Sequence, residues 1–263
     1  MTKTPADADS SGDISQVWLE RLCRRADDVL WSSYRLALGV PDAPWPRIML
    51  PLKGQERRVG EQEARSAFVA ALLADADAEA WAFAAEVPTR LSYRFAQRGS
   101  GLKAQRALTD LALYRHPGEA PALAVEFKSG GRSGKTEIDE SMRKDVAAIL
   151  AEQPDALWFQ VVRDANDATL GGLLRALDAA ISRLSNPFKL RDYLAPGKIV
   201  EPRAKMIAIH VCILNPDVTV SIHRALKYVP GKPERDFFTI ATTTTRTSLD
   251  IADGQGWSVY RRD

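Results

Sequence analysis

The sequence predicts an α/β fold in which helices flank a mixed sheet, and three observations support this prediction. Apolar residues recur every three or four positions over 15–38 and again over 60–78, as in amphipathic helices. The period then changes to two over 86–128, which is typical of half-buried strands. Helix and strand patterns alternate over 136–184, and strand patterns dominate after that. The predicted order is therefore α-βββ-α-β-α, followed by a β-rich segment.

Turn residues set the limits of the individual elements. Gly99-Ser100-Gly101 separates a strand at 86–95 from one at 107–115, and His116-Pro117-Gly118-Glu119 separates that one from a strand at 122–128. We expect these three strands to form an antiparallel meander. A helix over 136–152 then precedes a strand at 157–162, which is apolar enough for burial on both faces. The remaining elements are a helix at 170–184 and strands at 205–214, 218–223, 237–243 and 257–260.

These patterns divide the chain into four parts. Residues 1–14 are polar and predict a flexible tail, and 15–59 combine a helix with a proline-rich connector. We expect the folded core at 60–185. Residues 186–263 form a β-rich C-terminal extension, packed on the core, and the sequence does not say whether this extension is an independent domain.

Composition excludes several classes of protein. The 263 residues carry 36 basic and 34 acidic side chains, and a net charge of +2 excludes nucleic-acid binding by bulk charge. Cys23 and Cys212 are too few for a disulfide framework. The apolar run Met206–Leu214 is much shorter than the roughly 20 residues of a membrane helix, and the polar N-terminus does not resemble a signal peptide. We therefore expect a cytoplasmic protein with no membrane partner.

Charged residues within apolar strands indicate a site. Glu126 and Lys128 share one face of their predicted strand, and Asp110 lies within the strand before it. Such charges are costly to bury unless they pair or bind an ion. If the two strands pair, both carboxylates converge on one hard cation, for which Mg²⁺ is suited and Mn²⁺ is an alternative. Lys128 could then hold or deprotonate a water bound to that ion.

A further acid lies on the helix that precedes these strands. Glu61 is three residues before Ala64, which predicts a position at the core-facing edge of the helix. Glu61 could therefore supply or orient a third carboxylate. Glu63 lies on a different face of the same helix and is the alternative acid, and the N-terminal position also suits a simple helix-dipole charge.

These residues resemble the PD-(D/E)XK nuclease superfamily over about residues 60–165. Asp110 matches the first acid of its motif, Glu126 the second and Lys128 the lysine, whereas Thr109 departs from the motif's proline. The resemblance implies a restriction-endonuclease-like core, a Mg²⁺-dependent endodeoxyribonuclease activity and a metal ligand from the Phe127 carbonyl. It also implies a supporting polar residue on the following helix, at Lys144 or Asp145, and Glu61 as the acid of the leading helix.

A local excess of positive charge predicts DNA as the partner. No acidic residue occurs between Glu86 and Asp110, and two further basic residues lie among the glycines of the loop at 129–136. Such side chains contact phosphates without reading base sequence. The sequence is also compatible with a homodimer or a larger complex. The predicted DNA-binding residues are Arg90, Arg94, Arg98, Lys103, Arg106, Arg132 and Lys135.

Two other functions remain open at this point. The same fold could serve as a non-catalytic module that binds nucleic acid or protein. The segment 129–136 also approaches a P-loop, which would make the protein an NTPase, but Ser129 stands where that pattern requires glycine. His116, His210 and His223 show no metal-ligand spacing with the cysteines, so we expect them to be packed or surface histidines.

Overall fold

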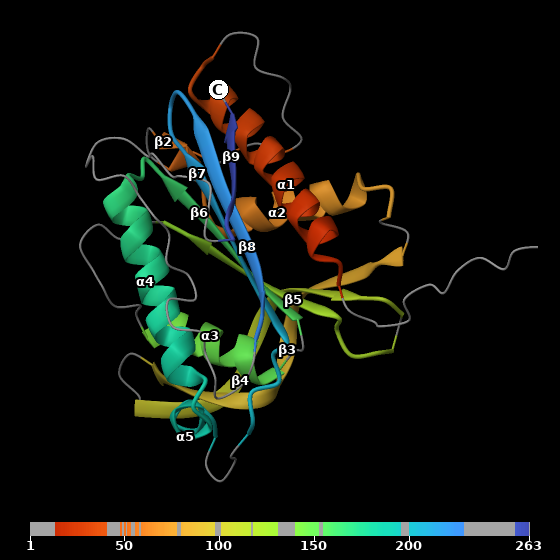
Figure 1. Cartoon of the computed structure of the whole chain (residues 1–263), viewed down its shortest axis with the longest axis vertical. Coiled ribbons are helices and arrows are strands. Elements are labelled where there is room, and N and C mark those ends of the chain that lie inside the picture. The colour runs from red at the N-terminus through yellow and green to blue at the C-terminus, as the bar shows by residue number, and fades with distance from the viewer. Residues whose placement is uncertain are drawn as a thin grey trace, which may run out of the picture.

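One sheet runs through the molecule and has helices on both of its faces (Figure 1). The computed structural model describes residues 14–40, 48, 50, 52–53, 56–57, 59–77, 80–97, 101–116, 118–130, 140–152, 155–195, 200–228 and 256–262. Within these residues the sheet has seven strands, which lie side by side in chain order. They are β3 (Ala82–Gln97), β4 (Gly101–Tyr114), β5 (Leu123–Ser129), β6 (Asp155–Arg163), β7 (Met206–Leu214), β8 (Thr219–Lys227) and β9 (Ser258–Arg262).

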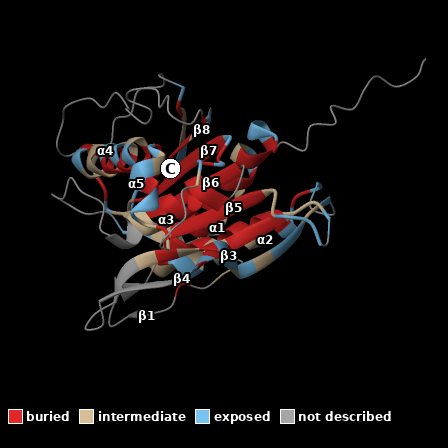
Figure 2. Cartoon of the chain, turned by 90° about the horizontal axis from the view of Figure 1, so that it is seen from below, coloured by how far each residue is buried: buried red, intermediate tan, exposed pale blue. Residues whose placement is uncertain are grey.

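The sheet is mixed, as the sequence predicts. β5, β6 and β7 run parallel to one another, and every other neighbouring pair is antiparallel. The meander β3-β4-β5 is therefore confirmed. The parallel β6 and β7 are buried along almost their whole length, because helices cover both faces of a parallel sheet. Figure 2 shows this burial concentrated in the central strands.

Helices cover both faces of the sheet (Figure 1). On one face, α1 (Gln16–Ala37) and α2 (Glu61–Leu73) share a core with Phe127 and Phe159. On the other face, α3 (Glu140–Glu152) and α4 (Asp167–Leu184) pack with Trp158 and Ile209. Side-chain caps begin two of these helices, because Ser15 accepts a hydrogen bond from the Trp18 N–H and Asn166 accepts one from the Thr169 N–H.

Several expectations need correction. The predicted tail included residue 14, but Ile14 is buried and its N–H donates to Asp155 Oδ2 at 3.4 Å. The rest of the predicted tail lies outside the described residues. The helix predicted to reach residue 78 ends at Leu73. The connector contains a short hairpin of β1 (Leu52–Lys53) and β2 (Glu56–Arg57), and the sequence patterns also missed α5 (Pro187–Arg191). The strand predicted at 237–243 lies outside the described residues.

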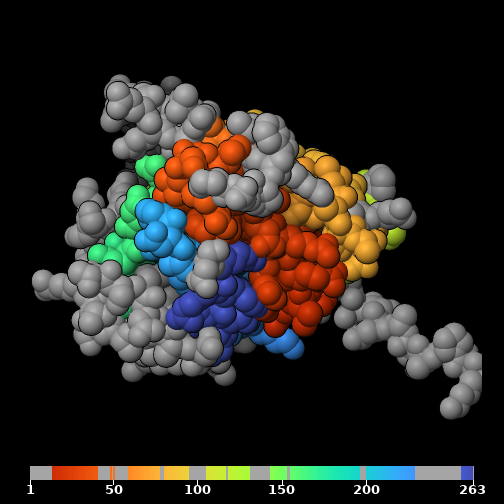
Figure 3. Space-filling view, turned by 90° about the horizontal axis from the view of Figure 1, so that it is seen from above, coloured from red at the N-terminus to blue at the C-terminus, as the bar shows by residue number. Residues whose placement is uncertain are grey.

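The strands after residue 200 continue the same sheet. β7 pairs with β6 over the whole length of both strands, so the chain before and after residue 185 builds one sheet. β9 closes this part of the fold beside α1, as Figure 3 shows in dark blue and red. There the Arg262 guanidinium lies 2.5 Å from the Asp28 carboxylate, and the Arg24 guanidinium lies 4.0 Å from the centre of the Tyr260 ring. None of the described helices is long and apolar enough to cross a lipid bilayer.

Candidate active site

The predicted site residues lie on the face of the sheet that α3 covers. Side chains alternate along β5, so Val125 and Phe127 join the core beneath α1 and α2, and Glu126 and Lys128 point to the opposite face. β4 pairs antiparallel with β5, and Asp110 lies one position beyond the last registered pair, Leu111 and Val125. The pairing of these strands brings Asp110 next to Glu126, as the alternation predicts.

Lys128 lies at the centre of three carboxylates. Its Nζ is 3.0 Å from Asp145 Oδ2, 3.6 Å from Glu126 Oε2 and 3.8 Å from Asp110 Oδ2. The exposed fractions of the side chains are 4% for Glu126, 8% for Asp145, 14% for Lys128 and 27% for Asp110. Asp110 is therefore the acid through which solvent or a ligand reaches this group of four, called below the Lys128 cluster.

Backbone and side-chain contacts hold the carboxylates in place. The Phe127 N–H donates to Asp110 Oδ2 at 2.8 Å, which fixes that carboxylate against β5. Asp145 comes from α3, and the Lys144 ammonium lies 3.3 Å from its other oxygen. The two residues expected on the following helix thus lie at the Lys128 cluster, and Asp145 makes the shortest contact with Lys128.

The charges of the cluster shift the pKa values of its members. Burial raises the pKa of Glu126 well above its ordinary value, and the charge of Asp110 raises it further, while Lys128 opposes the shift. Hydrogen bonding between the Glu126 and Asp110 carboxyl groups acts in the same direction. Burial lowers the pKa of Lys128, but the surrounding charges of Asp145, Glu126 and Asp110 outweigh it and raise the pKa overall. Lys128 is therefore an ammonium ion at neutral pH.

Sequence reasoning missed two neighbours of the cluster. Gln160, buried in β6, is the registered partner of Lys128; it donates to the Gly130 carbonyl at 2.7 Å and accepts from Trp158 Nε1 at 3.1 Å. Lys128 Nζ lies 5.8 Å from the centre of the Trp158 ring. The sequence contains a signal for Gln160, because a glutamine inside an apolar strand is costly to bury unless its amide is hydrogen-bonded.

Glu61 does not lie where the helical spacing places it. Glu61 is the first residue of α2 and is exposed, whereas the buried face of the helix begins at Ala64. A residue in the first turn has no preceding turn to cover it, and a carboxylate there is favoured by the helix dipole. Glu63, the alternative acid, caps the same helix by accepting the Gly60 N–H at 2.7 Å. α2 also covers the face of the sheet opposite to the Lys128 cluster.

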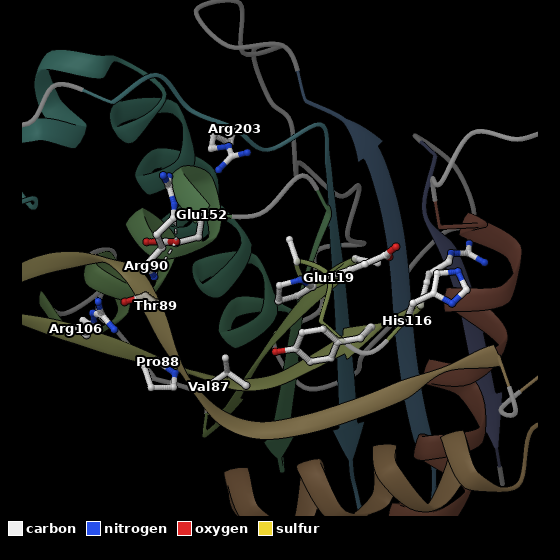
Figure 4. A pocket seen from close by; sticks show the side chains of 14 residues that line it. Val87, Pro88, Thr89, Arg90, Arg106, His116, Glu119, Glu152 and Arg203 are labelled. Carbon is white, nitrogen blue, oxygen red and sulfur yellow. Dashed lines mark hydrogen bonds and ion pairs between the residues drawn. The ribbon is translucent and has the colours of Figure 1, made fainter.

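The predicted DNA-binding residues divide into three groups. Arg90 and Arg106 line a pocket of about 800 Å³ between β3, β4 and the end of α3, where Arg115 and Arg203 join them (Figure 4). Arg94 is half-buried and is not part of this lining. Arg98, Arg132 and Lys135, like the side chain of Lys103 and most of the 129–136 loop, lie outside the described residues.

In metal-free solution, replacing Glu126 with glutamine should raise the free energy of unfolding by more than about 1 kcal/mol near pH 8. The amide keeps the shape of the side chain and removes a charge that burial and Asp110 disfavour. Because the raised pKa makes the folded wild type bind a proton more tightly than the unfolded chain does, wild type gains stability as the pH falls. The difference in free energy of unfolding between Glu126→Gln and wild type should therefore disappear towards about pH 4. Urea unfolding in EDTA over a range of pH values measures this difference. A difference that widens at acid pH would contradict the role of burial assigned to Glu126. Glu119→Gln, which changes an exposed glutamate, serves as the control.

Comparison with known proteins adds no family assignment. No protein family model matches the chain, and no curated protein is significantly similar to it.

Proposed function

We propose that this protein is a metal-dependent nuclease that hydrolyses DNA phosphodiester bonds on a restriction-endonuclease-like core. One observation carries the proposal: a buried lysine ammonium lies among three carboxylates, two of which come from paired strands of the sheet. A structural ion pair needs one carboxylate per lysine. Burial and the charge of Asp110 disfavour the ionised form of Glu126, which a bound divalent cation would favour, and a cluster of this kind is typical of a functional site.

The donor atoms of the cluster fit Mg²⁺. Asp110 and Glu126 bring carboxylates together that repel each other, and one of them is partly open to solvent. Both would hold the ion, with the Phe127 carbonyl and waters completing its oxygen ligands. When bound, Mg²⁺ polarises a phosphodiester and lowers the pKa of a coordinated water. Mn²⁺ accepts the same ligands.

The protonated state of Lys128 defines its role. Its raised pKa makes it a poor proton acceptor, so we assign it to holding the attacking water and offsetting the charge that develops on the phosphate. Asp145 and Gln160 are positioning residues. Asp145 fixes the ammonium, and Gln160 fixes the backbone where β5 ends, through the Gly130 carbonyl.

The arginine-lined pocket is the proposed path of the DNA backbone. In Figure 4, Arg90, Arg106 and Arg203 gather near Glu152, away from His116. Arg106 and Asp110 belong to the same strand, so DNA bound along β4 would reach the Lys128 cluster. These contacts are expected to be with phosphates and to be insensitive to base sequence.

Replacing Arg106 with alanine should weaken DNA binding about equally for unrelated sequences and lower the slope of log affinity against log salt concentration by about 1. Fluorescence anisotropy with labelled duplexes in EDTA measures this. Arg183→Ala on α4 is the matched control and should leave the slope unchanged. An unchanged slope for Arg106→Ala would remove this pocket from the DNA path.

Cleavage assays test the function itself. We expect purified protein to cut supercoiled or linear DNA with Mg²⁺ or Mn²⁺, and to lose this activity in EDTA or on Asp110→Asn. Cleavage that persists in Asp110→Asn belongs to a contaminant and would overturn the proposal. DNA binding without cleavage by the wild type would instead identify a non-catalytic module. ATP hydrolysis lost on Lys135→Ala would identify an NTPase.

A further inference from the structure

A second cluster of chemically reactive side chains lies on the opposite face of the sheet. His210 in β7 and His223 in β8 are registered cross-strand partners, and Cys23 reaches them from α1. One donor atom from each of the three residues lies within 4.8 Å of the other two. All three side chains are buried, at 0% exposed for Cys23, 0% for His210 and 2% for His223.

The histidines have donor and acceptor atoms that the protein leaves unused. Within the described part of the chain, neither ring nitrogen of His223 has a hydrogen-bond partner, and neither does Nδ1 of His210. Burial of such atoms without partners costs free energy, and native proteins rarely leave them so. The neutral imidazole is the form of histidine that binds metals.

A carboxylate orients one of the histidines. Nε2 of His210 lies 2.9 Å from both oxygens of Asp27, which is fully buried one helical turn after Cys23. With Nε2–H donating to Asp27, the lone pair of His210 is on Nδ1, the atom that has no partner. Histidines that bind metals commonly donate their other ring N–H to a carboxylate in this way.

We propose that Cys23, His210 and His223 form a transition-metal site suited to Zn²⁺, with Asp27 as the residue that orients His210. One thiolate and two imidazoles are the donors that Zn²⁺ prefers, whereas Mg²⁺ prefers oxygen. The site is distinct from the Lys128 cluster, which lies on the other face of the sheet. A bound ion would link α1 to two strands that are distant in sequence, and would stabilise that contact.

The proposal is tested by adding Co²⁺ to the full-length protein after chelator treatment. We expect one equivalent of Co²⁺ to give the visible d–d bands of a tetrahedral ion and a thiolate-to-cobalt charge-transfer band, and Zn²⁺ to abolish both. Cys23→Ser should remove the charge-transfer band. Cys212→Ser, which changes the other buried cysteine, should retain it. Asp27→Asn should keep the band and weaken the affinity about 10- to 100-fold.

Two results would overturn the proposal. One is the absence of stoichiometric Co²⁺ binding by the folded wild type, shown folded by circular dichroism. The other is a charge-transfer band that survives in Cys23→Ser. Asp110→Asn provides the link to the first site, because it should abolish DNA cleavage and leave the cobalt spectrum unchanged.

Discussion

Lys128→Met should lower the rate of Mg²⁺-dependent DNA cleavage about 10³-fold. Methionine preserves most of the apolar stem but removes the ammonium that lies 5.8 Å from the centre of the Trp158 ring. Among the described side chains, this ammonium is the only cation that contacts both Glu126 and Asp110. The transition state then forms without the positive charge that offsets the negative charge developing on the phosphate. We expect this loss in the cleavage rate at saturating Mg²⁺ and saturating DNA.

Lys144→Met is the matched control for this substitution. It removes the neighbouring ammonium, which contacts Asp145 but lies on the helix rather than on β5. Cleavage by this variant should stay within about tenfold of wild type, because no transition-state contact is lost. DNA binding in EDTA should be similar in both variants. If Lys128→Met cleaved as fast as Lys144→Met, the ammonium of Lys128 would have no part in the reaction.

Glu152→Ala should lower the free energy of unfolding by about 3–5 kcal/mol. The pairing of β3 with β4 is interrupted between Pro88 and Ser92, so residues there lack the usual cross-strand partners. The Glu152 carboxylate replaces these partners, accepting from the Arg90 N–H at 3.1 Å, the Leu91 N–H at 2.7 Å and the Tyr93 hydroxyl at 2.9 Å. Alanine would leave these three donors, two of them buried, without the carboxylate that accepts from them.

Urea unfolding measures this loss, and two comparisons define its cause. Glu152→Gln keeps one carbonyl oxygen and should lose less stability than alanine does. Glu119→Ala, which removes an exposed glutamate from the same pocket, should change the free energy of unfolding by less than about 0.5 kcal/mol. Equal losses in Glu152→Ala and Glu119→Ala would contradict the role assigned to the Glu152 carboxylate.

Local patterns in the sequence predicted most of the helices and strands and placed part of the Lys128 cluster together. Alternation along β4 and β5 gives the face of each side chain, which is why Asp110, Glu126 and Lys128 could be predicted to lie together. Asp145 could be named as a supporting residue, but its place as the shortest contact of Lys128 depends on how α3 crosses the sheet. No periodicity encodes that crossing.

Residues brought together by tertiary structure were harder to predict. The spacing of Cys23, His210 and His223 along the chain resembles no metal motif, because one donor comes from α1 and two from strands near the other end of the chain. For Glu61, a local pattern alone leads to a wrong prediction. Its spacing to Ala64 indicates the core-facing edge of a helix, but α2 begins at Glu61 and leaves this residue exposed.

The position of β9 beside α1 has a consequence for synthesis in the cell. α1 is translated well before β9, yet its contacts with Tyr260 and Arg262 require that later strand. Translation adds about 5–20 residues each second, so the outer face of this helix waits many seconds for its partner. A nascent chain that lacks β9 exposes the edge of β8, and unpaired strand edges promote aggregation. Binding by a chaperone during this interval would protect the growing chain.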